Sequence, residues 1–399
     1  MEKVRFGLIG IGAQGGAYAG FLTGQGGFPG MPAPQCPPHC ALGALCDIDP
    51  EKEKMCREKY PDVPFFKDWK EMVASGTVDA VITTVPHYLH HEIAIYCLEH
   101  GMNVLVEKPA GVYTKQVREM NEEAKKHPDV VFGMMFNQRT NCIYRKMREL
   151  VQSGVYGNIR RTNWIITNWY RPQAYYDSGD WRATWSGEGG GVLLNQCPHQ
   201  LDLWQWICGM PKKVEAHLHY GMWHNIEVED DVTTYVEYEN GATGVFITST
   251  GDAHGTNRFE IQLDKAKIVA EGDRLTVLEY DMTEQEFSKT NTKPFGMVGA
   301  HEVDPQLDGE NPQHKGVINA WGGAILRGEP LIAGGEEGIN GLTLSNAMHL
   351  SSWLGKEITL PFDEDLYYNE LMKRVATSKR KTDVKEVVAD TSNTYAGSK

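Results

Sequence analysis

The sequence predicts an α/β protein of two domains: a doubly wound parallel sheet at the N-terminus, then an α+β domain with a large, mostly antiparallel open sheet. Apolar strands alternate with helix patterns from residue 4 onward, which indicates the first domain. Strand-like runs follow one another from residue 159, which indicates the second. The 399 residues, 41% of them hydrophobic, suffice for two cores. We place the domains at 1–136 and 137–375, followed by a polar tail at 376–399 whose last dozen residues we expect to be disordered.

The first strand leads directly into a glycine-rich turn. Residues 4–15 read VRFGLIGIGAQG, so Gly10-x-Gly12-x-x-Gly15 follows a buried strand and precedes a helix pattern. Gly10 permits the tight turn, Gly12 lets a pyrophosphate approach backbone N–H groups, and Gly15 lets helix and strand pack closely. This strand–turn–helix context favours dinucleotide binding over a purely structural turn.

The second strand, 41–46, ends at Asp47, where a carboxylate accepts hydrogen bonds from the adenosine ribose hydroxyls. Asp47 lies 32 residues after Gly15, which is more than usual, and the Gly/Pro-rich stretch 24–38 explains the excess as a surface loop. A carboxylate at this position repels a 2′-phosphate, so NAD is favoured over NADP.

A third strand, 79–86, and a fourth, 104–106, complete the pattern of the parallel sheet. The fourth strand stops at Glu107-Lys108-Pro109, and in an open parallel sheet ligands bind outside the carboxyl ends of the strands. Histidines 87, 90 and 91 follow the third strand, where we expect contact with the cofactor or helix capping rather than a metal. The expected cofactor-binding residues are Gly10, Gly12, Ala13, Gln14, Gly15, Asp47, Pro86, His87, His90, Glu107, Lys108 and Asn137.

Composition excludes several classes of function. A formal charge of −14 argues against binding to nucleic acid and suggests a neutral or cationic small molecule as the partner. Eight cysteines are too sparse for a disulfide framework, and the pair Cys36 and Cys40 lacks further ligands for zinc. No apolar run reaches the ~18 residues of a membrane span and no secretion signal is visible, so we expect a cytoplasmic protein without a metal site.

The second domain is expected to form a β-meander. An amphipathic helix at 141–154 precedes strand-like segments, and Glu239-Asn240-Gly241-Ala242 is a strong hairpin signal. Such a sheet does not leave both faces in water, so we expect self-association through it as a dimer or tetramer. The segments are 159–168, 212–220, 231–238, 243–249, 258–264 and 274–280.

Three stretches together carry a family resemblance: GLIGIGAQG, TTVPHYLHHEIAIYCLEHGMNVLVEKPA and GEGGGVLLNQCPHQLDLWQWICG. From about residue 4 to residue 362, the chain resembles the glucose–fructose oxidoreductase, inositol dehydrogenase and MocA family. The resemblance implies a Rossmann domain followed by a sheet domain, with NAD(P) and a polyol or sugar meeting between them. Asn137 and Arg139 resemble the family's passage between the domains.

The resemblance also implies a catalytic histidine at His199 and a supporting acid at Asp202. The family carries an acid where this chain has Asn195. On a helix, Asn195 and His199 are four residues apart and share a face, and Asp202 is close enough to touch His199. A lone histidine on an apolar helix is usually a core residue, but the preceding glycines and Asp202 favour a general base here. Lys108 would stabilise the developing alkoxide.

The segment NWYRPQAYYDSGDWRATW (168–185) is rich in aromatic and charged residues. It is interpreted either as a platform for a sugar or as packing that fills the seam between domains. The expected substrate-binding residues are Arg139, Tyr170, Arg171, Tyr176, Trp181, Arg182 and Trp185.

These patterns and the family resemblance together predict an NAD-dependent oxidoreductase that moves a hydride between a secondary alcohol of a pyranose sugar or glycoside, at carbon 3, and NAD. Three alternatives stay open. One is a glycosidase that acts by transient oxidation and elimination, and another is an inositol or polyol dehydrogenase. The third is a sugar- or NADH-sensing regulator without turnover.

Overall fold

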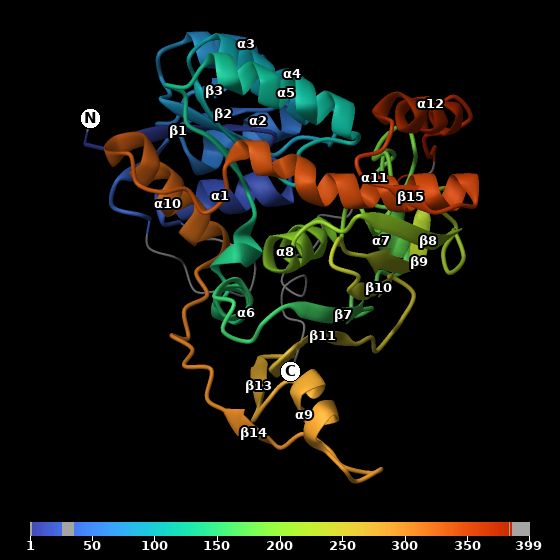
Figure 1. Cartoon of the computed structure of the whole chain (residues 1–399). Helices are drawn as coiled ribbons and strands as arrows, with labels where there is room; N and C mark the ends of the chain where they lie inside the picture. Colours follow the sequence, from blue (N-terminus) through green and yellow to red (C-terminus); the bar gives the residue numbers. More distant parts are fainter. Residues whose placement is uncertain (1, 26–35, 383, 385–399) are drawn as a thin grey trace.

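Two β-sheets organise the chain, one in each half of the sequence (Figure 1). The computed structural model describes residues 2–25, 36–382 and 384. Most of the loop predicted at 24–38, and the last dozen residues of the predicted tail, lie outside the described residues.

The N-terminal sheet has six strands in the order β3-β2-β1-β4-β5-β6, all parallel. The strands are β1 (Val4–Ile9), β2 (Cys40–Cys46), β3 (Phe65–Phe66), β4 (Ala80–Thr83), β5 (Asn103–Val106) and β6 (Phe132–Met134). This order is that of the doubly wound dinucleotide-binding fold, so the predicted fold class of the first domain is confirmed.

Helices cover both faces of this sheet (Figure 1). One face carries α3 (Trp69–Ala74), α4 (Leu89–Glu99) and α5 (Thr114–Lys126), and the other carries α1 (Ala13–Thr23) and α10 (Gln313–Arg327). Helix α2 (Pro50–Lys59) connects β2 to β3. Phe6 of β1 contacts Trp321 of α10, with their ring centroids 5.3 Å apart. The chain therefore returns to the first sheet after it has built most of the second.

The second sheet has nine strands in the order β14-β13-β12-β11-β7-β10-β9-β8-β15. Neighbours are antiparallel except β7 and β10, which are parallel. The predicted large, mostly antiparallel sheet is therefore confirmed, but it is mixed and is not a simple meander. The strands are β7 (Ile159–Ile166), β8 (Lys213–Tyr220), β9 (Glu229–Glu237), β10 (Thr243–Ser249), β11 (Asn257–Leu263), β12 (Ala266–Glu271), β13 (Arg274–Tyr280), β14 (Ala300–Val303) and β15 (Ile358–Thr359).

The hairpin predicted at residues 239–242 is confirmed. β9 and β10 pair antiparallel across it, and Gly241 has a φ of +82°, a left-handed conformation that favours glycine. Strands β12, β14 and β15 were not predicted. β12 follows β11 after only two residues, Asp264 and Lys265, which lack the glycine or proline that usually marks a turn.

Helices α8 (Pro198–Cys208) and α11 (Gly338–Leu354) cover one face of the second sheet, and Trp204 of α8 stacks on Phe246 of β10 at 5.4 Å. The remaining helices are α6 (Cys142–Gln152), α7 (Gln173–Tyr176), α9 (Glu284–Thr290) and α12 (Glu364–Val375), with 3-10 turns η1 (Asn137–Thr140) and η2 (Gly335–Glu337). Over the part of the chain that is described, no helix has the length and apolar character needed to cross a membrane.

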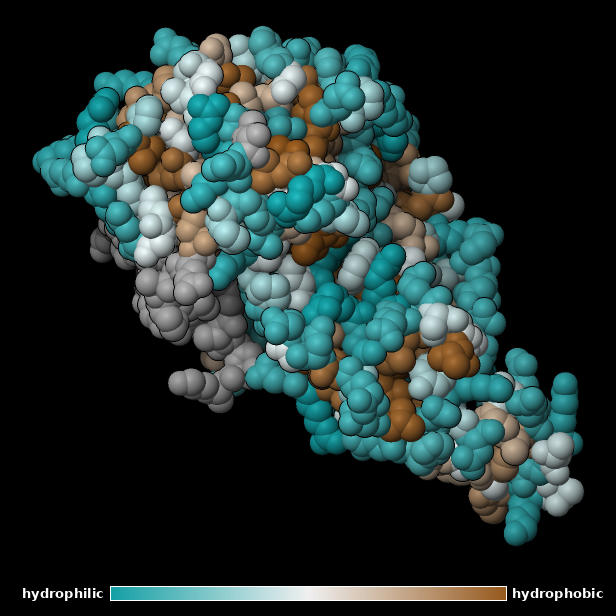
Figure 2. Space-filling model, turned by 90° about the vertical axis from the view of Figure 1, so that its left-hand side faces the viewer, coloured by the Kyte–Doolittle hydropathy of each residue, from teal (hydrophilic) through white to brown (hydrophobic). Residues whose placement is uncertain are grey.

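An arm formed by β13, α9 and β14 projects from the end of the second sheet (Figures 1 and 2). None of the residues of α9 is buried. Between α9 and β14, Phe295 and Met297 are 96% and 86% exposed. The arm is remote from the junction of the two sheets, where the candidate site lies.

Candidate functional site

A cleft of about 600 Å³ lies at the carboxyl ends of the strands of the first sheet and is closed on its other side by residues 169–199. It brings together most of the residues that the sequence singled out. Those that line it are Gly10, Gly12, Ala13, Gln14, Asp47, Pro86, His87, His90, Glu107, Lys108, Arg171, Trp181, Arg182, Asn195 and His199.

The glycine turn between β1 and α1 forms part of one wall. Gly10 has a φ of +92°, and a Cβ at Gly15 would overlap the carbonyl oxygen of Gly10, so both positions require glycine. A Cβ at Gly12 would project into open space, and α1 has no side-chain N-cap. Gln14 Nε2 is buried without a hydrogen-bond partner among the described residues. A helix N-terminus with free N–H groups and an open approach fits a pyrophosphate.

Asp47 follows the last residue of β2, at the position predicted for the ribose-binding carboxylate. Its Oδ2 accepts a hydrogen bond from the N–H of Ile11 at 2.6 Å, and its Oδ1 accepts one from the N–H of Asp49 at 3.0 Å. The two bonds fix the carboxylate, and each oxygen keeps a lone pair for a ribose hydroxyl. Lys67 also lines this end of the cleft, and its Nζ forms an ion pair with Glu53 Oε2 at 3.1 Å.

Glu107 and Lys108 follow the end of β5. The Tyr18 hydroxyl and the N–H of Lys108 both donate to the Glu107 carboxylate, and burial raises the pKa of Glu107 to about 7. The half-buried Lys108 donates from Nζ to the backbone carbonyl of Asn195 at 2.9 Å, and burial lowers its pKa. The Lys108–Pro109 peptide bond is cis. Lys108 therefore bridges the first domain to the turn that precedes α8.

His199 lies in the first turn of α8 and is 3% exposed. Neither ring nitrogen has a hydrogen-bond partner among the described residues. Burial lowers the pKa of His199 well below its ordinary value, and the charge of Lys108 acts in the same direction. A buried imidazole that is neutral, unpartnered and in a cleft fits a general base that awaits a ligand.

The spacing had suggested that Asn195 and His199 share one face of a helix, and this is wrong. Helix α8 begins at Pro198, and Asn195 belongs to the preceding turn, where its N–H donates to the Gly191 carbonyl at 2.9 Å. Proline is favoured in the first turn of a helix because it has no N–H to satisfy, which explains this start. Both Asn195 and His199 line the cleft in spite of the helix boundary.

Glu188 is a residue of the site that the sequence analysis did not identify. It is buried, its Oε1 accepts a hydrogen bond from the Asn195 amide, and its Oε2 accepts one from the N–H of Ala183 at 2.6 Å. Burial raises the pKa of Glu188, whereas the positive charges of Arg182 and Lys108 oppose that rise. The only signal in the sequence was a single acid inside the glycine run GEGGG.

The expectation that Asp202 orients His199 is wrong. Asp202 accepts two hydrogen bonds from the Arg139 guanidinium, at 2.7 and 2.8 Å, and Arg139 also donates to Glu337 at 2.7 Å. Arg139 is 2% exposed and does not line the cleft, so its expected contact with substrate is not supported either. A charge-assisted bidentate pair is stronger than a bond to a neutral imidazole, which explains why Asp202 faces Arg139.

The aromatic segment 168–185 is divided between the cleft and the core. Trp169, Tyr175 and Trp181 line the cleft, of which only Trp181 was among the expected substrate-binding residues. Trp185 is buried against His349 and Trp353, and Tyr170 is 43% exposed outside the lining. The two interpretations of this segment therefore each hold for part of it.

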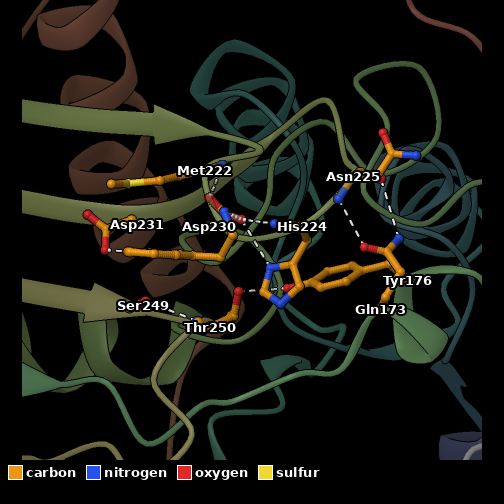
Figure 3. Close-up of polar contacts among 11 residues, drawn as sticks. Gln173, Tyr176, Met222, His224, Asn225, Asp230, Asp231, Ser249 and Thr250 are labelled. Atoms are coloured by element: carbon orange, nitrogen blue, oxygen red, sulfur yellow. Dashed lines mark hydrogen bonds and ion pairs between the residues drawn. The ribbon is translucent and has the colours of Figure 1, made fainter.

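Tyr176 is also a core residue rather than a lining one, and it anchors the segment (Figure 3). Its hydroxyl donates to Thr250 Oγ1 at 2.7 Å, and its ring lies 4.9 Å from that of His224. Asp230 accepts bonds from the backbone N–H groups of the 222–224 turn and from His224 Nδ1. This network fixes the segment that carries the lining aromatics.

The remaining expected residues have backbone partners or other side-chain partners. His90 lies between two backbone carbonyls, with its Nδ1 2.7 Å from that of Pro109 and its Nε2 3.0 Å from that of Val85. His87 Nδ1 lies 3.0 Å from the backbone carbonyl of Glu188. Asn137, expected near the cofactor, is fully buried and donates to Gln313 outside the cleft lining. Within residues 2–25, 36–382 and 384, no three His, Cys, Asp or Glu side chains form a group that could hold a metal ion.

Comparison with known families gives the same assignment as this geometry. The model of the oxidoreductase family's NAD-binding Rossmann fold matches residues 4–134, and that of the GFO/IDH/MocA C-terminal domain matches residues 144–269. The chain belongs to the Gfo/Idh/MocA family. It is an NAD-dependent oxidoreductase, and the nicotinamide, when bound, accepts or returns a hydride.

Two curated members of the Gfo/Idh/MocA family and one solved structure illustrate the relationship. Levoglucosan dehydrogenase of Pseudarthrobacter phenanthrenivorans is 25% identical over 70% of this chain and 76% of that protein. D-glucoside 3-dehydrogenase of Escherichia coli is 29% identical over 50% of this chain and 60% of that protein. The WlbA dehydrogenase of Chromobacterium violaceum, solved with NADH and UDP-GlcNAcA, has a TM-score of 0.75 and 27% identity, covering 91% of this chain and 97% of its own.

Proposed function

We propose that this enzyme moves a hydride between carbon 3 of a pyranose sugar or glycoside and NAD. The observation that carries the proposal is the convergence of Lys108, from the first domain, and His199, from the second, on the cleft that also holds the glycine turn and Asp47. The named dehydrogenases of levoglucosan and D-glucosides to which the chain is similar support a sugar as the substrate.

The residues would divide the work on the substrate hydroxyl. Loss of a hydride from an alcohol carbon requires loss of the hydroxyl proton, and His199 is the group that would accept it. Lys108 would stabilise the developing alkoxide with its ammonium charge. The side-chain amide nitrogen of Asn195 points to Glu188 and Tyr175. Its side-chain oxygen, Oδ1, is left to accept a hydrogen bond from a substrate hydroxyl.

The test begins with the protein as purified. Denaturation followed by mass spectrometry would identify any nucleotide that it retains, and we expect NAD or NADH. Neutral and acidic pyranosides and myo-inositol are then screened for NADH absorbance at saturating NAD, with Lys108→Ala as the inactive control. NADH formed in proportion to a 3-keto product is the expected result. Release of the aglycone without net NADH would indicate the glycosidase alternative, and turnover of myo-inositol alone would indicate the polyol dehydrogenase.

A further inference from the structure

Two arginines, Arg171 and Arg182, line the cleft from the second domain. Their guanidinium groups lie over the ring of Tyr175, at 5.3 and 4.6 Å from its centroid. Trp169 and Trp181 provide a second aromatic face for each, at 5.5 and 4.6 Å. Stacking of this kind holds the plane of a guanidinium in place while its N–H groups stay available.

Neither arginine forms an ion pair with a carboxylate among the described residues, although the charge of Arg182 lowers the pKa of the nearby Glu188. Arg171 Nη1 donates to the backbone carbonyl of Tyr170 at 2.9 Å, and Arg182 Nη1 donates to the hydroxyl of Tyr175 at 3.0 Å. A guanidinium has five N–H donors, so each arginine has donors to spare. In contrast, the buried Arg139 is bonded to two carboxylates.

The acids nearest in sequence have other partners. Asp177 and Asp180 form ion pairs with Lys381 and Arg380 of the C-terminal segment, at 3.6 and 3.2 Å. Both oxygens of Glu188 accept hydrogen bonds, from Ala183 and Asn195. The C-terminal cations thus neutralise the acids of the 168–185 segment and leave its two lining arginines for a ligand.

The part of the cleft around Lys108 is therefore positive. Burial lowers the pKa of Lys108, the nearby acids Glu107 and Glu188 oppose that change, and the charges of Arg171 and Arg182 add to it. Three cationic side chains thus face two acids in this part of the cleft. The acids among the lining residues are Asp47, at the ribose end, and Glu107, which accepts hydrogen bonds from Tyr18 and Lys108. The net charge of −14 had suggested a neutral or cationic partner, but the local charge indicates the opposite.

We infer that the sugar carries an anionic oxygen group, which Arg171 and Arg182 bind, and that a sugar carboxylate is the best fit. This inference rests on the proposed function and adds the substrate class to it. A carboxylate accepts two parallel N–H bonds from one guanidinium, and a phosphate has the same ability. A neutral glycoside would leave the two stacked guanidinium groups without an anionic partner.

The test compares matched substrates that differ only at carbon 6. Initial rates of NADH formation are measured for p-nitrophenyl glucosides, galactosides and mannosides and for the corresponding uronides, and for glucose and glucose 6-phosphate. We expect kcat/KM for one acidic sugar to exceed that of its neutral counterpart by at least tenfold. Preference for the uronide identifies a carboxylate as the anion, and preference for glucose 6-phosphate identifies a phosphate. Equal or better turnover of the neutral sugars would overturn the inference and leave the proposed function intact.

Variants assign the preference to the arginines. In Arg171→Gln and Arg182→Gln, we expect the ratio of acidic to neutral kcat/KM to fall toward one, whereas Arg160→Gln, on β7 and remote from the cleft, should keep it. A ratio unchanged in both cleft variants would contradict the assignment. If no sugar yields NADH, the proposed function fails. Calorimetric titration of the NADH-saturated protein with the uronides then still tests the arginines, and absence of binding would overturn the inference.

Discussion

Lys108 and Asn195 are joined across the cleft by a single hydrogen bond of 2.9 Å between an ammonium group and a backbone carbonyl. This bond places the cation beside the turn that leads to His199. On the other side, the Glu188 carboxylate accepts a hydrogen bond from the Asn195 side-chain amide. A cationic, a neutral and an acidic residue, Lys108, Asn195 and Glu188, therefore meet where we expect the substrate to bind. The chemistry of the site depends on these few atoms.

Substitution of Lys108 separates catalysis from cofactor binding. Lys108→Ala should lower turnover on the order of 10²–10³ through lost stabilisation of the alkoxide. The affinity for NAD should change little, because phosphate binding is assigned to the glycine turn. Steady-state rates and calorimetric titration with NAD check the two effects, and a parallel loss of NAD affinity would contradict this division of roles.

The pH dependence of sugar oxidation should report His199. As a general base it must be neutral, and its pKa lies well below 6.5, so the rate should fall only when the pH drops well below that value. His199→Ala should lower turnover by roughly 10²–10⁴ and abolish this acidic limb.

A carboxylate at position 195 would favour the imidazolium and move the limb to higher pH. Asn195→Asp alone should give only a small shift, since the introduced carboxylate and that of Glu188 would share a proton. The double variant Asn195→Asp with Glu188→Gln should have its acidic limb at a higher pH than the single variant Glu188→Gln. Identical pH profiles in all these variants would show that position 195 does not influence His199.

At the scale of elements, Arg139 connects η1 to α8 through Asp202 and to η2 through Glu337. Its guanidinium also lies over the rings of Phe136 and Trp206, at 5.2 and 5.0 Å. The pair with Asp202 is almost fully buried, so it sets the position of α8 and hence of His199. It takes the place of the contact between Asp202 and His199 that the spacing had suggested.

Removal of Arg139 should be strongly destabilising. Arg139→Met leaves Asp202 buried and unpaired, and we expect a loss of about 3–5 kcal/mol in the free energy of unfolding. Arg139→Met combined with Asp202→Leu should recover part of that loss, because no isolated charge is then left in the core and Glu337, the other partner of Arg139, is partly exposed. Urea unfolding checks both variants. If the free energy of unfolding of Arg139→Met lies within about 1 kcal/mol of that of the unmodified protein, the pair does not fix the position of α8.

Local patterns predicted the elements well and the contacts between them less well. The glycine turn, the strand that ends at Asp47 and the hairpin at Gly241 depend on neighbours in sequence, so their signals survive in a single chain. The separation of Trp181 from Trp185 depends on which side of a folded segment each ring faces. Likewise, Glu188 has a role only because the fold places it against Asn195, and no spacing rule predicts that contact.

For the whole molecule, the outer face of the second sheet exposes a patch of apolar side chains. Val245 and Ile247 of β10 are half-buried there, next to Tyr235 and Ile165, which are 39% and 37% exposed. Phe246 points to the opposite face and is fully buried beneath α8. An apolar patch of this kind at the centre of a sheet usually marks an interface.

We expect the protein to be oligomeric at micromolar concentration and Val245→Lys to dissociate it. The lysine places a charge in the centre of the apolar patch, while Val155→Lys, at an exposed position outside the sheet, should have no effect. Sedimentation velocity gives the mass of each variant, and NAD titration verifies that the first domain is intact. A monomer before any substitution would refute self-association through this face.

The most direct test of hydride transfer uses a pyranoside that carries deuterium at carbon 3 and is turned over at saturating NAD. We predict that deuterium appears in the NADH released to solution, with one NADH formed for each 3-keto sugar, and that Lys108→Ala slows both together. Released NADH without deuterium would mean that the hydride comes from another carbon, and aglycone release without free NADH would contradict a net dehydrogenase.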